Sequence, residues 1–395
     1  MEDRRVYMDY NATTPLHPEV RTALVEAFDI YGNASSLHAS GREAAALVEK
    51  AREKVAALIG AQAEEIVFTG GGSESNNTVL HMIDCGSAAC RCVSPDKRGL
   101  ITTVVEHPSV LSAAEHLQRK GLPVAYIPVD GTGKLDMDAF AAALSEKTSL
   151  VSVMMGNNEI GTIQDIKTIA GMARRAGALV HTDAVQAVGK VTVDVRDLGV
   201  DFLSFSGHKL YGPKGVGVLY VRRGAPFCTF IHGGHQEHGR RAGTYNSTGI
   251  IGLGKAVEVA AREMGAESAR LWALREKLRR GIEKTIPDIH VNGHPRDTLP
   301  GTLNVSFRGA EGEAILLYLD MAGIQVSTGS ACASGSLEPS HVLLATGVGA
   351  ELAHGSVRFS LGRENTEADV DYVLDRLPGI IRKTRSMSTV YAGRR

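Results

Sequence analysis

Short apolar runs alternate with amphipathic stretches along the chain from about residue 40 to residue 260. Residues 41–60, GREAAALVEKAREKVAALIG, carry apolar positions at helical spacing and predict a helix that ends at Gly60. Residues 65–83 then predict a strand, a glycine loop and another helix. A parallel sheet with crossover helices produces this alternation, so the first part of the chain is predicted to be α/β.

Further apolar runs in this part end in polar residues. Each is rich in β-branched residues and predicts a strand. Open α/β sheets bind ligands beyond the carboxyl ends of their strands, so we expect the functional residues at these polar ends. The runs are LITTVVEH, LVSVMMGNNE, ALVHTDAVQ and VDFLSFSGHKLYGPKGVGVLYV, at residues 100–107, 150–159, 178–186 and 200–221.

After about residue 260 the pattern changes. A long helix is predicted around residues 267–286, followed by shorter apolar runs and a final helix introduced by Thr366 and Asp369 at capping-box spacing. We therefore expect a large domain over residues 1–260 with a mainly parallel sheet, and a smaller α+β C-terminal domain over residues 261–395. A packing of the N-terminal segment against the smaller domain is left open.

The length of 395 residues suits two domains, because single cores stop growing at roughly 250–300 residues. With 43 basic and 44 acidic residues the net charge is -1, which gives no reason to expect a nucleic-acid surface. The sequence offers no apolar stretch of about 18 residues and no apolar signal segment near its start, so we expect a cytoplasmic protein that is not in a membrane. Five cysteines without framework spacing argue against a secreted disulfide scaffold.

Residues 69–75, TGGGSES, lie between a predicted strand and a predicted helix. Backbone N–H groups in such a loop and at the helix N-terminus can form an anion nest, and phosphate is its natural guest. No Gly-Lys-Ser/Thr follows, so the loop is not a Walker loop. Ser75 stands where the third glycine of G-x-G-x-x-G would be, so it is not that fingerprint either. The loop alone is a weak signal, since many such loops are only tight turns.

Two strand ends strengthen the phosphate hypothesis. Lys209 follows a predicted strand and precedes a Gly-Pro turn, with Ser206 and His208 beside it as donors. Asp183 ends another strand and has the charge needed to keep a pyridine nitrogen protonated. A lysine amine near an anion nest is where pyridoxal phosphate is held covalently. Taken singly, a surface lysine and a helix-capping aspartate are the simpler interpretations; the combination favours a pyridoxal phosphate site.

These segments resemble the cysteine desulfurase family, a class V aminotransferase branch of the fold-type I pyridoxal-phosphate enzymes. The resemblance covers nearly the whole chain, from YMDYNATTP to RKTRSMS. The motifs occur in the family's order and at similar spacing: GGGSESNN, VVEHPSV, NNEIGTIQDI, HTDAVQAVG, SFSGHKLYGPKG, RRAGT and SGSLEPSHVL. The resemblance implies a fold-type I transferase fold with pyridoxal 5'-phosphate as cofactor.

The resemblance also implies a role for individual residues. Lys209 is the lysine that binds the cofactor, and His107 stacks on its ring and assists proton transfer. Arg358 is similar to the clamp for the substrate carboxylate, a bidentate task that suits a guanidinium group, and Asn11 lies with it on the substrate side. The further residues that would contact the cofactor are Gly72, Ser73, Asn158, Asp183, Gln186, Ser206, His208 and, from a second subunit, Thr244.

Cys332 lies in a run of Ser, Gly, Ala and Thr at residues 326–343 that has little apolar area to bury. It occupies the position of the family's nucleophilic cysteine. The resemblance implies a homodimer that converts L-cysteine to L-alanine, holds the sulfur on Cys332 as a persulfide and passes it to an acceptor such as an iron–sulfur scaffold protein. Departures from the family pattern are Ser73 in place of threonine, His235 in place of glycine and His238 in place of arginine.

Two alternatives remain open from the sequence. Another class V enzyme, an aminotransferase or a selenocysteine lyase, would share Lys209 without needing the nucleophilic cysteine. A non-catalytic cysteine or metal carrier would instead use Cys85, Cys90 and Cys92, which lie in an insertion before the strand that precedes His107. Their C-x4-C-x-C spacing differs from that of structural zinc sites, so we expect small apolar residues beside a loop.

Overall fold

The computed structural model describes residues 4–85, 92, 96–328 and 338–388. In this part of the chain a seven-stranded sheet runs in the order β2-β8-β7-β6-β5-β3-β4. Neighbours from β7 to β4 are parallel, whereas β8 is antiparallel to both β7 and β2. The strands are β2 (Ile66–Thr69), β3 (Gly99–Thr103), β4 (Val124–Ile127), β5 (Thr148–Ser152), β6 (Leu179–Asp183), β7 (Phe202–Ser206) and β8 (Gly217–Val221).

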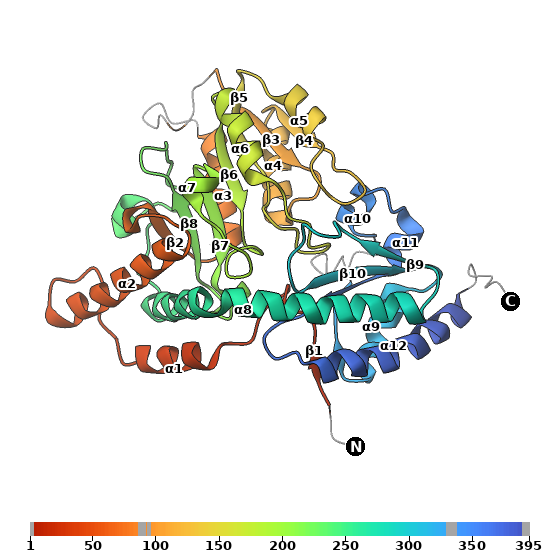
Figure 1. Ribbon diagram of the computed structural model, residues 1–395. Helices are drawn as coiled ribbons and strands as arrows, with labels where there is room; N and C mark the ends of the chain where they lie inside the picture. The colour runs from red at the N-terminus through yellow and green to blue at the C-terminus, as the bar shows by residue number, and fades with distance from the viewer. Residues whose placement is uncertain (1–3, 86–91, 93–95, 329–337, 389–395) are drawn as a thin grey trace.

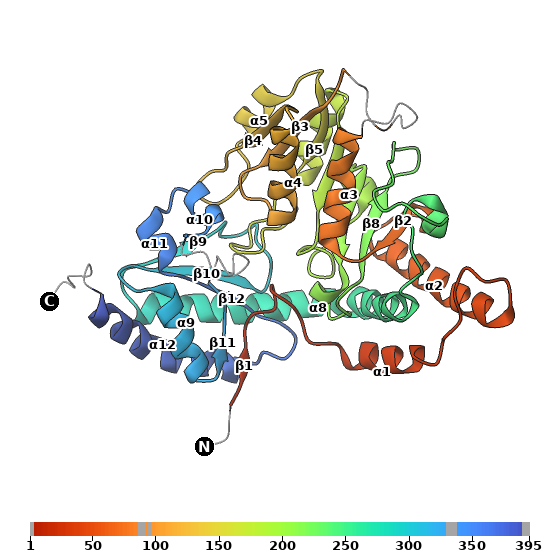
Figure 2. The same cartoon turned by 180° about the vertical axis from the view of Figure 1, so that it is seen from behind.

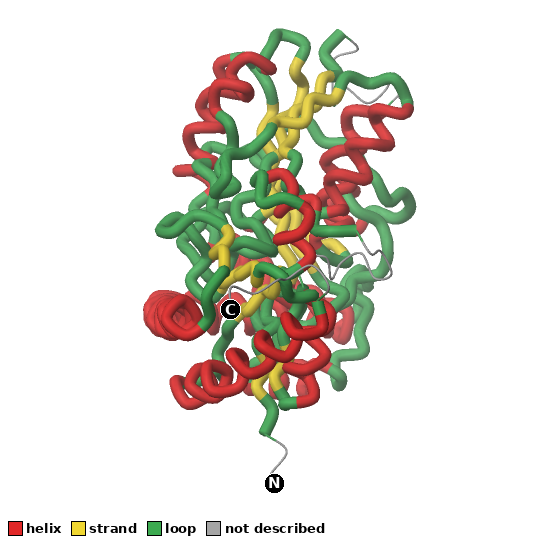
Figure 3. The backbone as a smooth tube through the Cα atoms, turned by 90° about the vertical axis from the view of Figure 1, so that its right-hand side faces the viewer, coloured by secondary structure: helices red, strands yellow, loops and turns green. Residues whose placement is uncertain are grey.

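Helices cover both faces of this sheet, which forms a central layer when the molecule is seen side on (Figure 3). Helices α3 and α4 lie on the face turned to the viewer in Figure 2, and α6 and α7 lie on the face seen in Figure 1. A parallel sheet needs this double cover because its strands are apolar on both sides. The helices of this part are α1 (Pro18–Ala27), α2 (Ala39–Leu58), α3 (Gly72–Asp84), α4 (Pro108–Arg119), α5 (Met137–Ala143), α6 (Ile166–Arg175) and α7 (Val195–Leu198).

The α/β prediction is confirmed, including the helix before Gly60 and the strand, loop and helix around the TGGGSES segment. Residues 200–221 differ from the expectation of one strand with a polar end. They form two antiparallel strands, β7 and β8, joined by a short 3-10 turn, Gly207–Lys209. The Gly-Pro segment after Lys209 reverses the chain direction, and Lys209 therefore lies at the sheet edge.

The C-terminal part has a three-stranded antiparallel sheet, β12-β10-β9, and a parallel pair formed by β1 and β11. The predicted capping box of the last helix is present, because the Thr366 and Asp369 side chains each accept a backbone N–H. The elements here are β1 (Val6–Tyr7), β9 (Ile289–Asn292), β10 (Thr302–Phe307), α9 (Gly312–Met321), β11 (Ile324–Gln325), α10 (His341–Ala345), α11 (Ala350–His354), β12 (Ser356–Ser360) and α12 (Glu367–Met387).

Helix α8 (Ser247–Thr285) joins the two parts and crosses the lower half of the molecule in Figure 1 from one side to the other. Its first half packs into the core under the large sheet, as Leu253 does, and its second half packs into a separate core, as Leu278 does. That second core also contains Val6 and Met8 from the N-terminus. We propose that the two domains divide within α8 near residue 260 and that β1 packs with the smaller domain.

Candidate active site

The carboxyl ends of neighbouring strands β7, β6, β5 and β3 deliver polar side chains to one edge of the large sheet. Asp183 is the last residue of β6, Ser206 is the last residue of β7, and His107 caps the N-terminus of α4 just beyond β3. They line a cavity of about 260 Å³. The other lining residues are Asn11, Ala12, Gly72, Ser73, Asn76, Ser109, Met154, Gly156, Asn158, Val185, Gln186, His208, Lys209 and Arg358.

A second, more open cavity of about 600 Å³ adjoins this one at the N-terminus of α3. The backbone N–H groups of Gly72 and Ser73 lie in the first helical turn, where they have no partner within the helix. A Cβ on Gly217 would lie 2.6 Å from the Cα of Gly71, so the glycine in β8 lets the loop approach the sheet. Ser206, His208 and Lys214 also line this cavity, as does Glu74, whose carboxylate is paired with Arg241. The remaining lining residues are Ala12, Thr13, Gly70 and Gly215. The backbone donors and the Lys214 ammonium group suit an anion, and Lys214 was not predicted from the sequence.

The imidazole of His208 is neutral in this setting. Burial, with the positive charges of Lys209 and Lys214, lowers the pKa of His208 to about 4. Its Nδ1 hydrogen-bonds with the Thr13 hydroxyl at 3.1 Å. In this state the His208 side chain offers hydrogen bonds and carries no charge.

Lys209 reaches back to the N-terminal segment of the chain. Its Nζ donates to the backbone carbonyls of Asn11 and Ala12, both at 2.6 Å. The Asn11 carbonyl also accepts a hydrogen bond from Gln186 Nε2 at 2.8 Å. The N-terminal segment thus contacts both the lysine and the glutamine that were predicted to hold the cofactor.

A chain of hydrogen bonds links His107 to Asp183. His107 Nδ1 accepts the Ser109 backbone N–H at 3.1 Å and contacts the Ser109 hydroxyl at 2.8 Å. Asn76 Nδ2 then donates to that hydroxyl at 2.9 Å and to Asp183 Oδ2 at 2.6 Å. Burial lowers the pKa of His107, so the ring is neutral at pH 7 and its remaining proton is on Nε2.

Asn76 and Ser109 were not predicted as site residues, although both lie inside motifs that the sequence analysis quoted. They lie three and two positions after the predicted site residues Ser73 and His107, and nothing in the local pattern distinguishes them from helix surface positions. Only the packing of α3 beside α4 brings the two side chains together.

Lys190 is a further site residue that the sequence does not reveal. Its Nζ donates to Gln186 Oε1 at 2.6 Å and to Asn11 Oδ1 at 3.1 Å, both neutral oxygens. Burial, with the charges of Lys209 and Arg358 nearby, lowers the pKa of Lys190 to about 7. Because Lys190 can only donate, it holds the Oε1 atom of the Gln186 amide toward itself. The Nε2 atom of the amide therefore points to the Asn11 carbonyl.

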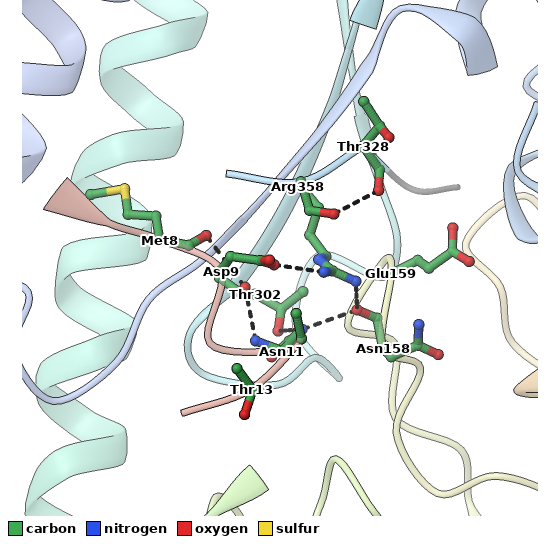
Figure 4. A network of polar contacts seen from close by, with 12 residues as sticks. Met8, Asp9, Asn11, Thr13, Asn158, Glu159, Thr302, Thr328 and Arg358 are labelled. Atoms are coloured by element: carbon green, nitrogen blue, oxygen red, sulfur yellow. Dashed lines mark hydrogen bonds and ion pairs between the residues drawn. The ribbon is translucent and has the colours of Figure 1, made fainter. Parts of the chain in front are cut away.

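Arg358 lies on β12 and extends from the smaller domain into the cavity (Figure 4). Its guanidinium group donates to Asp9 Oδ1 at 2.7 Å and to the Asn158 carbonyl at 3.1 Å. The Asn11 side chain spans the same junction, since its Nδ2 donates to the Asn158 carbonyl and to Thr302 Oγ1. Four segments that are distant in sequence therefore meet at this point: residues 9–11, Asn158, β10 and β12.

The two ends of the segment that carries Cys332 are held against the site. On one side, Ser327 pairs through its backbone with Arg358, with N···O distances of 2.7 and 3.2 Å. On the other side, Ser340 Oγ donates to Glu159 at 2.5 Å, and the His341 ring contacts the Glu106 carbonyl at 3.1 Å. Burial raises the pKa of Glu159 to about 7.

The structure brings most of the predicted site residues to one place. Gly72, Ser73, His107, Asn158, Asp183, Gln186, Ser206, His208, Lys209, Asn11 and Arg358 all line the main cavity. Thr244 is exposed and lines neither cavity, and its assignment to the site of a second subunit stays a prediction. Cys332 lies outside the described residues.

The donor set fits a planar group with an anion at one end and a basic ring nitrogen at the other. The α3 N-terminus and neighbouring donors suit the anion, and the Asp183 carboxylate suits a protonated nitrogen. Two buried polar atoms, Asn76 Oδ1 and Arg358 Nε, have no hydrogen-bond partner among the described residues. Buried polar groups normally have partners, so their presence beside this cavity is consistent with a polar ligand.

Known proteins resemble the chain over almost its full length. The family model for class-V aminotransferases matches residues 6–373. Cysteine desulfurase IscS of Dictyoglomus turgidum is 49% identical, over 98% of this chain and 96% of the relative. A cysteine desulfurase of Gluconacetobacter diazotrophicus is 50% identical, with the same coverage of both chains.

Solved structures agree with this result. A structure titled NIFS-LIKE PROTEIN superimposes with a TM-score of 0.89 at 39% identity, covering 96% of this chain and 100% of its own. Another, titled SspA in complex with cysteine, has a TM-score of 0.80 at 34% identity, covering 91% and 100%. Among the described residues no helix is both long enough and apolar enough to span a membrane. The fold and the sequence together show that the chain belongs to the cysteine desulfurase family, within the class-V aminotransferases.

Proposed function

We propose that this enzyme uses pyridoxal 5'-phosphate to convert L-cysteine to L-alanine and transfers the substrate sulfur to Cys332 as a persulfide. The observation that carries the proposal is one cavity lined by the Lys209 amine, the Asp183 carboxylate and the Arg358 guanidinium group, with an anion site adjoining it. The neighbour solved in complex with cysteine supports the choice of substrate.

The residues that would hold the cofactor are those with matching chemistry. The α3 N-terminus, Ser206 and His208 would bind its phosphate, Asp183 would pair with its ring nitrogen, and Lys209 would bind it covalently. When bound, pyridoxal phosphate withdraws electrons from the bonds around the Cα of an amino acid. The positively charged lysines at this site balance the charge of a phosphate.

The chain's own groups then account for binding and proton transfer. Arg358 would bind the substrate carboxylate, since guanidinium matches a carboxylate in a bidentate way. Its existing contact with Asp9 orients the group and leaves Nε without a partner among the described residues. The Lys209 amine would accept the proton from the substrate Cα, and the His107 Nε2–H would serve the later proton transfers.

Cys332 is close enough in sequence to the site to act as the sulfur acceptor. It lies five positions after Ser327, whose backbone pairs with Arg358, and an extended chain spans at most about 3.6 Å per residue. As a thiolate, Cys332 would attack the substrate sulfur and form an S–S bond while the Cβ–S bond breaks. Cβ gains a proton, the products are alanine and the persulfide, and no outside oxidant is required.

We further propose that the enzyme works as a homodimer and delivers sulfur to an acceptor protein such as an iron–sulfur scaffold. The exposed position of Thr244, outside the cavities of its own chain, supports a contribution to a second subunit. The cytoplasmic location expected from the sequence stays a prediction.

The test is incubation of the purified holoenzyme with ³⁵S-labelled cysteine, followed by alanine measurement and mapping of the label. The wild type is expected to form alanine and to carry label on Cys332 that dithiothreitol releases. Cys332→Ser should bind cysteine without forming a persulfide, because a hydroxyl stays protonated and is a weak nucleophile toward sulfur. Cys90→Ser is the matched control and should behave as the wild type. Label confined to another cysteine, or persulfide formation without alanine, would overturn the proposal.

A further inference from the structure

Three cysteine thiols from separate segments converge at the end of the sheet opposite the active site. Cys85 caps the C-terminus of α3, Cys92 lies in the segment before β3, and Cys228 follows β8. The three sulfur atoms all lie within 4.8 Å of one another, and Cys85 Sγ is 3.2 Å from Cys228 Sγ. Cys92 and Cys228 are buried and Cys85 is partly exposed.

Core packing alone does not account for this geometry. Cys92 and Cys228 do lie in an apolar cluster under α3 and α4, where a cysteine can serve as a small apolar residue. Apolar packing, however, has no preference for placing sulfur against sulfur. Here three polarisable ligand atoms, drawn from three places in the chain, face one another.

The spacing fits a single metal ion. Zinc binds thiolates at about 2.3 Å in tetrahedral geometry, which places ligand sulfurs about 3.8 Å apart. The distances here, from 3.2 Å to no more than 4.8 Å, bracket that value. An iron–sulfur cluster holds its cysteine ligands around several iron atoms, so their sulfurs lie farther apart than in a mononuclear site.

The thiols lie far from the active site along α3. Cys85 is at the C-terminus of this helix of 13 residues. That helix is about 20 Å long, and its other end forms the anion site described above. The thiols are therefore remote from the reacting atoms.

We propose that Cys85, Cys92 and Cys228 bind one zinc ion, as thiolates. The ion joins the end of α3 to the segment that enters β3 and to the segment that follows β8, and its role is structural. The C-x4-C-x-C spacing is poor for zinc, so no metal site was expected in this region from the sequence. Cys228 lies far from Cys85 and Cys92 in the sequence, so the spacing of the cysteines gave no sign that it belongs with them. Only the fold brings its thiol next to theirs.

The proposal is tested on the full-length holoenzyme, purified under reducing conditions without chelator. After reconstitution with zinc chloride and desalting, elemental analysis is expected to find about one zinc ion per chain. Cys228→Ser should lose this ion. Cys332→Ser is the matched control and should keep it, which separates the proposed site from metal bound by the catalytic thiol.

A second measurement covers the case in which Cys228→Ser fails to fold. Titration of the wild type with cobalt chloride should produce thiolate-to-cobalt charge-transfer absorption, which zinc chloride then abolishes. A chelator should lower the Tm of the zinc-loaded wild type. No retained zinc and no such absorption would overturn the proposal, as would equal zinc content in Cys228→Ser. A disulfide between Cys85 and Cys228 in the purified protein would overturn it as well, if the protein takes up no metal once this disulfide has been reduced.

Discussion

Replacing Glu106 by glutamine is expected to stabilise the enzyme at neutral pH. The side chain is 1% exposed, and its Oε1 accepts hydrogen bonds from Thr103 Oγ1 at 2.8 Å and from the Met154 N–H at 2.9 Å. Oε2 has no hydrogen-bond partner among the described residues. Burial raises the pKa of Glu106 to about 8. The folded enzyme therefore contains a neutral carboxylic acid at pH 7.

The sign and size of the effect follow from the pKa difference between the two states. In the unfolded chain a glutamic acid ionises near pH 4.5, so the unfolded state loses this proton first as the pH rises. The contribution of Glu106 to stability is full below pH 4.5 and is lost as the pH rises through 8. At 1.36 kcal/mol for each pKa unit, the loss between pH 5 and pH 7 is about 2–3 kcal/mol. Glutamine keeps an oxygen for both donors and has no proton to lose.

The assay is urea unfolding of holoenzyme at pH 5, 6, 7 and 8, followed by fluorescence. The Glu106→Gln variant should gain stability over the wild type as the pH rises, by about 2–3 kcal/mol from pH 5 to pH 7. Glu53→Gln, an exposed position on α2, is the matched control and should change the stability by less than about 0.5 kcal/mol. A constant difference between Glu106→Gln and the wild type at every pH would refute the reasoning.

Further predictions concern the proposed chemistry. Lys209→Ala should lower alanine formation by about 10²–10⁴-fold while the fold survives, and normal alanine production would contradict its assignment. Arg358→Lys should raise the KM for cysteine about tenfold or more while the cofactor is retained, because an ammonium point charge replaces the planar guanidinium group. An unchanged KM would show that the substrate carboxylate binds elsewhere. Lys190→Met should leave the Gln186 amide free to turn, and should therefore weaken cofactor binding. The pyridoxal phosphate concentration that half-reconstitutes the apoenzyme, measured by visible absorbance, should rise about tenfold. Lys167→Met, on the exposed face of α6, should leave that concentration unchanged.

Sequence patterns could predict those parts of the site that are fixed by single strands. Asp183 and Ser206 end buried strands, and a strand end is visible in the sequence as a change from apolar to polar residues. The order and direction of strands were less visible, because β7 and β8 are both short runs rich in apolar residues and only the segment between them reverses the chain. Contacts between distant segments, such as that of Lys190 with Asn11, leave no local signal.

The N-terminal segment shows why those distant contacts matter for activity. Asn11 receives hydrogen bonds from Lys209 and Gln186 at its carbonyl, and its side chain donates to Thr302 on β10 of the smaller domain. The backbone N–H of Asn11 donates to Ser360 Oγ on β12, two residues beyond Arg358. A single residue is thus bonded both to the residues proposed to hold the cofactor and to the sheet that carries the proposed substrate clamp. Because the bonds to Thr302 and Ser360 cross to the sheet that carries Arg358, the position of Arg358 relative to Lys209 and Gln186 depends on how the N-terminal segment packs between the two parts of the chain.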